Sequence, residues 1–202
     1  MRSLLIFDMD DTVVGTHHLI AASFEHAVAE YSILEPQENG VPMISGYSLS
    51  GMLSQKVPSD YLDKALERYH EYFKTHFDTK AQIYPSLKET LVQLRERQID
   101  LAILTGANRK WAEITLSESR LSSFFSVVMT SDEVKVPKPD PGGLTTIMRK
   151  FGANAGCTTY VGDEVRDIRT SRNACVQAVG RCPLGILGEG RIEVCRTRRN
   201  TQ

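Results

Sequence analysis

The sequence predicts an α/β protein: a doubly wound parallel sheet that carries an inserted, mainly helical cap. Two observations predict this class. Short apolar runs, often β-branched, alternate with amphipathic stretches along the 202 residues, which is typical of parallel strands joined by crossover helices. The long stretch between the first two runs instead has helical periodicity. We therefore expect a sheet interrupted by a helical insertion.

Five apolar runs are expected to form the sheet. The first lies near the N-terminus, and the others follow in the second half of the chain, where the connections are short enough for simple strand–helix–strand units. The runs are residues 4–7, 101–104, 125–129, 158–161 and 176–179.

The insertion is expected to be a small helical domain with its own aromatic core. Apolar residues recur at i, i+3, i+4 and i+7 spacing, which makes one apolar helix face. We therefore divide the chain into a core domain, residues 1–14 and 84–202, and a cap domain, residues 15–83. The apolar face and its aromatic core comprise Leu62, Ala65, Leu66, Tyr69, Tyr72, Phe73 and Phe77.

Polar residues follow three of the predicted strands at the point where each strand ends. Ligands of open parallel sheets bind outside the carboxyl ends of the strands, so these residues are expected to meet at one edge. They are Asp8, Asp10 and Asp11 after the first strand, Thr105 and Gly106 after the second, and Gly162, Asp163, Glu164 and Asp167 after the fourth.

Between the third and fourth predicted strands, flanking prolines are expected to present one lysine rigidly. In "KVPKPDP", prolines at 137, 139 and 141 are expected to hold Lys138 in an extended, non-helical segment.

Several carboxylates at one site repel one another unless a cation or a bound proton relieves them. Oxygen ligands without a histidine or thiolate nearby favour a hard ion, and Mg²⁺ fits best. A Mg²⁺ ion, a lysine and a threonine hydroxyl around carboxylates form a phosphoryl-binding site. The three acids in "DMDDT" are then interpreted as a nucleophile, a proton shuttle and a neighbour.

Four motifs in this order resemble those of the haloacid dehalogenase superfamily of aspartate-nucleophile phosphotransferases. They are "DMDDT", "LAILTG", "PKPDP" and "VGDEVRD". The insertion resembles the small helical cap of this superfamily. The segments "ISGYSLSGML", "RYHEYF" and "IYPSL" resemble its phosphoglycolate phosphatase-like branch.

The resemblance implies a role for each matching residue. Asp8 would attack phosphorus, and Asp10 would protonate the leaving oxygen and then accept a proton from water. The carboxylates of Asp8 and Asp163, with the main-chain carbonyl of Asp10, would bind Mg²⁺, while Asp167 would act through a water or orient the site. Thr105 and Lys138 would hold phosphoryl oxygens, together with the backbone amides of Met9, Asp10 and Gly106.

The sequence also departs from the family pattern at named positions. Asp11 replaces a glycine common in this branch, and Gly106 stands where an Asn or Ser side chain often contacts phosphate. Cys175 stands where a glycine often closes a helix, which costs about 1–2 kcal/mol if the backbone there is left-handed. After Val179 the resemblance fades.

We therefore expect a Mg²⁺-dependent phosphatase of a small phosphate monoester, with phosphoglycolate as the first substrate to test. Two alternatives stay open: a sugar-phosphate mutase of the same family, whose fourth motif typically begins Glu-Asp rather than Gly-Asp, and a non-catalytic relative that binds a phosphorylated ligand. A dinucleotide-binding dehydrogenase is excluded because no GxGxxG follows the first strand. Candidate cap contacts to substrate are Tyr47, Ser48, Lys56 and His70.

Composition sets the expected partners. A net charge of −1 implies no strong field for nucleic acid or an anionic membrane. We expect a cytoplasmic protein, monomeric or homodimeric, that binds a small phosphorylated metabolite.

Overall fold

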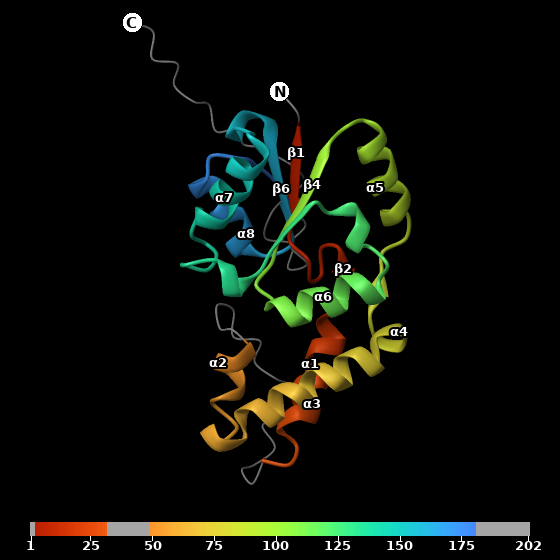
Figure 1. Ribbon diagram of the computed structural model, residues 1–202, viewed down its shortest axis with the longest axis vertical. Coiled ribbons are helices and arrows are strands. Elements are labelled where there is room, and N and C mark those ends of the chain that lie inside the picture. The colour runs from red at the N-terminus through yellow and green to blue at the C-terminus, as the bar shows by residue number, and fades with distance from the viewer. Residues whose placement is uncertain (1–2, 32–48, 181–202) are drawn as a thin grey trace, which may run out of the picture.

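A five-stranded parallel sheet forms the core of the computed structural model, which describes residues 3–31 and 49–180 (Figure 1). The strand order is β5-β4-β1-β6-β7, so β1 is central and the chain passes to one side of it and later to the other. All five predicted strands are confirmed, with their ends shifted by at most two residues. The strands are β1 (Leu4–Phe7), β4 (Asp100–Leu104), β5 (Val127–Met129), β6 (Thr158–Gly162) and β7 (Gln177–Gly180).

Helices cover both faces of this sheet, with α5 and α6 on one side and α7 and α8 on the other (Figure 1). Successive side chains of a strand point to opposite faces, and in β1 Ile6 packs in the cluster beneath α7 while Phe7 packs in the cluster shared with α5 and α6. Doubly wound packing, as predicted, therefore buries both faces. The helices are α5 (Leu87–Glu96), α6 (Arg109–Glu118), α7 (Gly142–Phe151) and α8 (Val165–Asn173).

The predicted helical insertion is confirmed and lies beyond the carboxyl ends of the strands (Figure 1). Of its expected aromatic core, Tyr69, Phe73 and Phe77 are buried. Tyr72 is only half-buried, because its ring stacks between His26 and His76 at the surface, with centroid distances of 4.6 and 3.9 Å. The helices are α1 (His17–Val28), α2 (Leu49–Leu53), α3 (Leu62–Thr75) and α4 (Phe77–Lys80).

The chain enters and leaves the insert through a short antiparallel ribbon, β2 (Val14–Gly15) with β3 (Gln82–Ile83). A β-carbon on Gly15 would lie 3.2 Å from the β-carbon of Gln82, so the close pairing favours glycine. Only helix was expected between the first two strands of the sheet, because two-residue strands carry no periodicity. Four 3₁₀ turns complete the described elements: η1 (Ser59–Tyr61), η2 (Ser122–Phe124), η3 (Ser131–Glu133) and η4 (Ala155–Cys157).

The insert packs against the core through α3 and α6. The ring of Trp111 on α6 lies against Tyr69 and Phe73 on α3, with centroid distances of 5.6 Å to each. These three side chains belong to one hydrophobic cluster that runs from the sheet into the insert. Within the described residues, the helices are all too short or too polar to cross a bilayer.

Candidate active site

The sequence-predicted carboxylates converge at the carboxyl ends of β1 and β6. Oxygens of Asp8, Asp163 and Asp167 all lie within 4.8 Å of one another. Asp8 directly follows the central strand β1, and its amide donates to the carbonyl of Val161 on β6 at 2.7 Å. The site therefore occupies the point where the strand order reverses, the usual ligand position in open α/β sheets.

Lys138 lies at the centre of these carboxylates. Its Nζ is 2.9 Å from Oδ1 of Asp8 and 2.7 Å from Oδ1 of Asp167, and it also contacts the hydroxyl of Tyr160 at 3.2 Å. The lysine is buried, with 8% of its surface exposed. A buried cation of this kind is stabilised only by charged and hydrogen-bonding partners, which these three groups supply.

The segment that presents Lys138 is a turn rather than the extended chain expected from its prolines. The amide of Asp140 donates to the carbonyl of Pro137 at 3.0 Å and closes the turn. The expectation of a non-helical segment is confirmed, and the expectation of an extended one is wrong. The turn reverses the chain at Lys138, which directs the ammonium inward.

Burial dominates the electrostatics of this cluster. Burial raises the pKa of Asp8 to about 7, although the nearby Lys138 ammonium opposes the shift. Burial likewise raises the pKa of Asp163 to about 6. Burial acts to lower the pKa of Lys138, but the carboxylates of Asp8 and Asp167 outweigh it and raise that pKa above its ordinary value. The carboxylates outnumber the lysine, so the cluster favours one more cation.

The donor set fits a hard divalent ion. The three clustered acids offer only carboxylate oxygens, which suit Mg²⁺ better than a soft metal. The hydroxyl of Thr12 donates to Oδ1 of Asp163 at 2.9 Å and fixes the direction of that carboxylate. Hydrogen bonds from neighbours of this kind orient metal ligands.

Asp167 is the most fully engaged of the three acids. Its Oδ1 accepts from Lys138 and from Tyr160, and its Oδ2 accepts from the amide of Glu164 at 3.0 Å. Gly162 makes this position possible, because a β-carbon there would lie 2.5 Å from Oδ2 of Asp167. Asp167 therefore holds Lys138 and the start of α8 in place.

Asp10 lies apart from the acidic cluster, toward the insert. The hydroxyl of Thr16 donates to Oδ1 of Asp10 at 2.6 Å. Burial raises the pKa of Asp10 to about 8, against the lowering effect of the Thr16 hydrogen bond. The carboxyl group of Asp10 is therefore suited to carry a proton near neutral pH.

The end of β4 supplies a hydroxyl and a backbone amide. The amide of Ala107 donates to Oγ1 of Thr105 at 3.0 Å, which leaves the hydroxyl proton of Thr105 available to a ligand. Within residues 3–31 and 49–180, the backbone amides of Met9, Asp10 and Gly106 donate to no protein acceptor. Unpaired amides at the ends of parallel strands form an anion-binding concavity.

Asp11 replaces a glycine that is common in the phosphoglycolate phosphatase-like branch. It has a left-handed backbone with φ +56°. Its Oδ1 accepts from the amides of Thr16 and His17, at 3.0 and 3.1 Å, and so caps the start of α1. The aspartate thus gains two hydrogen bonds that offset the backbone strain of a non-glycine residue.

Sequence reasoning missed four residues of this site: Thr12, Thr16, Tyr160 and Arg166. Each of them acts through a side-chain contact to another site residue, and such a contact cannot be predicted from the spacing of residues in the sequence. Glu164, which follows Asp163 in the fourth motif, forms an ion pair with Arg166.

Two of the four candidate cap contacts fall within the described residues. Tyr47 and Ser48 fall outside them, and Lys56 is exposed on the insert. His70 is buried on α3 and lines a cavity of about 620 Å³ together with Asn108 at the start of α6.

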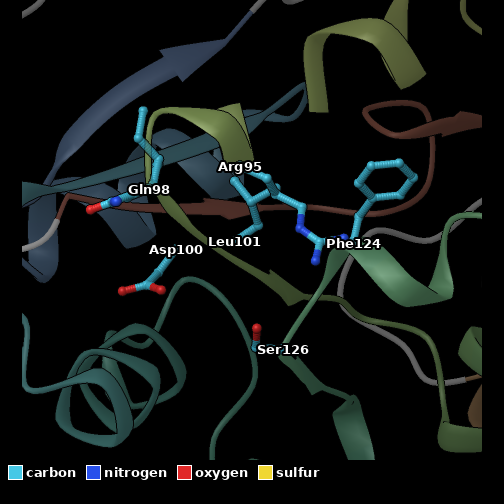
Figure 2. A pocket seen from close by; sticks show the side chains of 7 residues that line it. Arg95, Gln98, Asp100, Leu101, Phe124 and Ser126 are labelled. Carbon is cyan, nitrogen blue, oxygen red and sulfur yellow. The ribbon is translucent and has the colours of Figure 1, made fainter. Parts of the chain in front are cut away.

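A second cavity, of about 370 Å³, lies at the opposite edge of the sheet, where β4 begins. Figure 2 shows Arg95 beside the ring of Phe124 there. The guanidinium carbon of Arg95 lies 5.7 Å from the centroid of that ring. Leu101, which begins the second motif, lines this cavity, but none of the candidate site residues does, so the cavity is separate from the candidate site.

The chain belongs to the haloacid dehalogenase-like hydrolase family, whose model matches residues 5–180. It is therefore an enzyme of the hydrolase class, as the four motifs indicate. This match confirms the family resemblance found in the sequence.

Two curated relatives carry the name pyrophosphatase PpaX. The protein from Oceanobacillus iheyensis is 31% identical over 178 residues, covering 86% of this chain and 80% of its own length. The protein from Bacillus mycoides is 30% identical over 175 residues, covering 87% and 81%.

Solved structures agree with the fold. A predicted phosphoglycolate phosphatase from Haemophilus somnus has a TM-score of 0.77 at 23% identity, covering 89% of this chain and 84% of its own. CbbY from Rhodobacter sphaeroides, in complex with phosphate, has a TM-score of 0.78 at 14% identity, covering 96% and 91%. At these identities the likeness concerns the fold alone.

Proposed function

We propose that this protein is a Mg²⁺-dependent phosphatase that hydrolyses a small phosphate monoester through an aspartyl-phosphate. One observation carries the proposal: the carboxylate of Asp8 lies 2.9 Å from the buried ammonium of Lys138. The next two residues, Met9 and Asp10, have backbone amides that donate to no acceptor among the described residues. A nucleophile, a cation and anion-binding donors at one point are what phosphoryl transfer requires.

The residues that would hold Mg²⁺ are Asp8 and Asp163, through their carboxylates, and Asp10, through its main-chain carbonyl. Asp167 would support them from outside, because its oxygens already accept from Lys138, Tyr160 and Glu164. When bound, the ion neutralises negative charge that develops on the phosphoryl oxygens.

In the first step, a carboxylate oxygen of Asp8 attacks phosphorus while the bond from phosphorus to the leaving oxygen breaks. Asp10 gives its proton to that oxygen, a role that suits a buried carboxyl group whose pKa is raised to about 8. Thr105 and Lys138 hold the phosphoryl oxygens, and the amides of Met9 and Gly106 assist them.

In the second step, water attacks phosphorus of the aspartyl-phosphate. Asp10, now ionised, accepts a proton from that water, and the bonding electrons between Asp8 and phosphorus return to the carboxylate. Inorganic phosphate leaves, and both aspartates recover their starting states.

The proposed substrate is a small phosphorylated metabolite, with phosphoglycolate first and pyrophosphate second. The relatives named pyrophosphatase support the inclusion of pyrophosphate. Gly162 and Asp163 begin the fourth motif, which favours a phosphatase over a sugar-phosphate mutase.

We also propose the division of the chain into a core (1–14 and 84–202) and a cap (15–83), which the β2–β3 pairing at both crossing points supports. A cytoplasmic location is proposed on the sequence expectation alone.

The test is hydrolysis of a chromogenic aryl phosphate by the purified protein, with Mg²⁺ and with a chelator. We expect turnover that needs Mg²⁺ and disappears in Asp8→Asn. Pyrophosphate and phosphoglycolate follow in the same assay.

The matched control is Asp78→Asn, the same chemical change at an exposed residue of α4. It should hydrolyse the aryl phosphate like the unmodified protein. Turnover retained by Asp8→Asn would refute the covalent mechanism, and a folded protein that turns over none of the three substrates would favour the phospho-ligand-binding alternative.

A further inference from the structure

Arg166 lies between Glu164 and Asp167 in the fourth motif, but its side chain faces the second motif. It stands in the first turn of α8, and its guanidinium lies beside Gly106 at the end of β4. A β-carbon built on Gly106 would lie 3.7 Å from Nη2 and 3.9 Å from Nη1 of Arg166. The two segments are about 60 positions apart in the sequence, so only the fold joins them.

Glu164 fixes this guanidinium along one edge. Its carboxylate forms an ion pair with Nε and accepts from Nη2 at 3.1 Å. In the part of the chain that the structure describes, Nη1 has no hydrogen-bond acceptor. The planar guanidinium is therefore anchored through Nε and Nη2. Its free Nη1 lies at nearly the same distance from the space beside Gly106 as Nη2 does.

The guanidinium also lies within the electrostatic field of the catalytic cluster. Burial acts to lower the pKa of Arg166, but Glu164, Asp8 and Asp167 raise it. The Arg166 side chain is 26% exposed, so a ligand that enters from solvent can contact it.

Gly106 has no side chain, which leaves a space beside the guanidinium of Arg166. In the family that the chain resembles, an Asn or Ser side chain at this position often contacts phosphate. Gly106 is exposed and does not adopt the left-handed backbone, so the conformation does not require glycine. A donor from α8 can therefore take the place of the missing side chain.

We propose that Arg166 binds the transferred phosphoryl group through its free Nη1 edge, in place of a side chain at position 106. This inference rests on the proposed function, since it adds a second cation to the site where Lys138 already holds phosphoryl oxygens. An arginine offers a phosphate charge-assisted and directional hydrogen bonds.

The first test measures inhibition by inorganic phosphate and the kinetic constants for the aryl phosphate and for pyrophosphate. Arg166→Ala should weaken phosphate inhibition by roughly ten- to a hundredfold, the usual loss for a hydrogen bond to a charged group. The loss should be similar for both substrates, because both transfer a phosphoryl group. Arg169→Ala, an exposed arginine on the same helix, serves as the matched control and should match the unmodified protein.

The second test is a double-mutant cycle. Gly106→Asn should lower kcat/KM in the unmodified protein, because the amide beyond the β-carbon competes with the guanidinium for one space. In the Arg166→Ala background the same substitution should raise kcat/KM severalfold, because the amide then replaces the lost donor. A merely structural role for Arg166 gives no such reversal of sign.

Unchanged phosphate inhibition in Arg166→Ala would overturn the inference. A loss of kcat/KM for pyrophosphate alone would also overturn it, because Arg166 would then bind the leaving group. Failure of the proposed function looks different: the unmodified protein then hydrolyses nothing. In that case the rise in melting temperature with added phosphate still tests Arg166, and an equal rise in Arg166→Ala overturns the inference.

Discussion

The hydroxyl of Tyr160 lies 3.0 Å from Oδ1 of Asp167, and both oxygens contact the ammonium of Lys138. The tyrosine has one proton to donate, for which Asp167 and the carbonyl of Leu104, at 3.2 Å, compete. Lys138 thus lies between two carboxylates and a hydroxyl that orients it.

Tyr160→Phe removes only this hydroxyl. We expect kcat to fall roughly tenfold, since losing a group that orients a catalytic residue typically has this effect, and KM to change little. The free energy of unfolding should fall by about 1 kcal/mol. Steady-state kinetics and denaturant unfolding measure both.

Tyr69→Phe is the matched control, because the Tyr69 hydroxyl is buried without a hydrogen-bond partner among the described residues. Its loss should leave stability unchanged or raised. Equal kinetics for Tyr160→Phe and the unmodified protein would contradict the positioning role.

Thr16→Val should shift the pH dependence of kcat. Burial raises the pKa of Asp10, and the hydrogen bond from Thr16 lowers it. Without that donor the pKa rises further, so Asp10 stays protonated to higher pH and the alkaline limb moves upward. Thr16→Ser retains the hydroxyl and should keep the original profile; a downward shift in Thr16→Val would contradict the assignment of Asp10.

The stabilisation by Mg²⁺ should grow with pH. Burial raises the pKa of Asp8 from 3.8 to about 7 and that of Asp163 to about 6. Between the ordinary pKa of 3.8 and these raised values, the folded metal-free protein binds more protons than the unfolded chain. Its free energy of unfolding therefore falls as the pH rises through this range. Mg²⁺ binds the ionised carboxylates and competes with those protons.

The measurement is the rise in melting temperature with saturating Mg²⁺, which should be larger at about pH 8 than at about pH 5. Asp163→Asn should reduce the rise at the higher pH. An equal rise at both pH values would exclude the buried carboxylates as the binding site.

Cys175→Gly should stabilise the protein. Cys175 has a left-handed backbone, with φ +55°, as considered from the sequence. Glycine removes a strain of about 1–2 kcal/mol, and its greater freedom in the unfolded chain cancels about half of that gain. We therefore expect the free energy of unfolding to rise by about 0.5–1 kcal/mol.

Cys175→Ala separates the backbone effect from the loss of the thiol, because alanine keeps the β-carbon. It should leave stability near that of the unmodified protein. If alanine stabilises as much as glycine, the gain comes from the thiol and the strain argument fails.

The strands and the convergence of the motifs could be predicted because both follow from simple rules. Continuous apolar runs mark buried parallel strands, and the topology of a parallel sheet brings the residues after Phe7, Leu104 and Gly162 to one edge. The family motifs then assign the polar residues at that edge to named roles.

The connections inside the site could not be predicted in the same way. The contact of Thr16 with Asp10, and that of Tyr160 with Lys138, depend on side-chain directions that only the folded backbone sets. The turn at Lys138 was missed because prolines fix φ locally but do not reveal the hydrogen bond that reverses the chain.

Trp111 is the sole tryptophan of the sequence, and it lies at the contact between α6 and the insert, against Tyr69 and Phe73. Trp111 is buried, with 6% of its surface exposed. Intrinsic fluorescence of the unlabelled protein therefore reports on this one contact, and any separation of α3 from α6 shifts the emission to longer wavelength. The fold thus contains its own optical probe for the approach of the insert to the sheet, readable in a stopped-flow experiment during turnover.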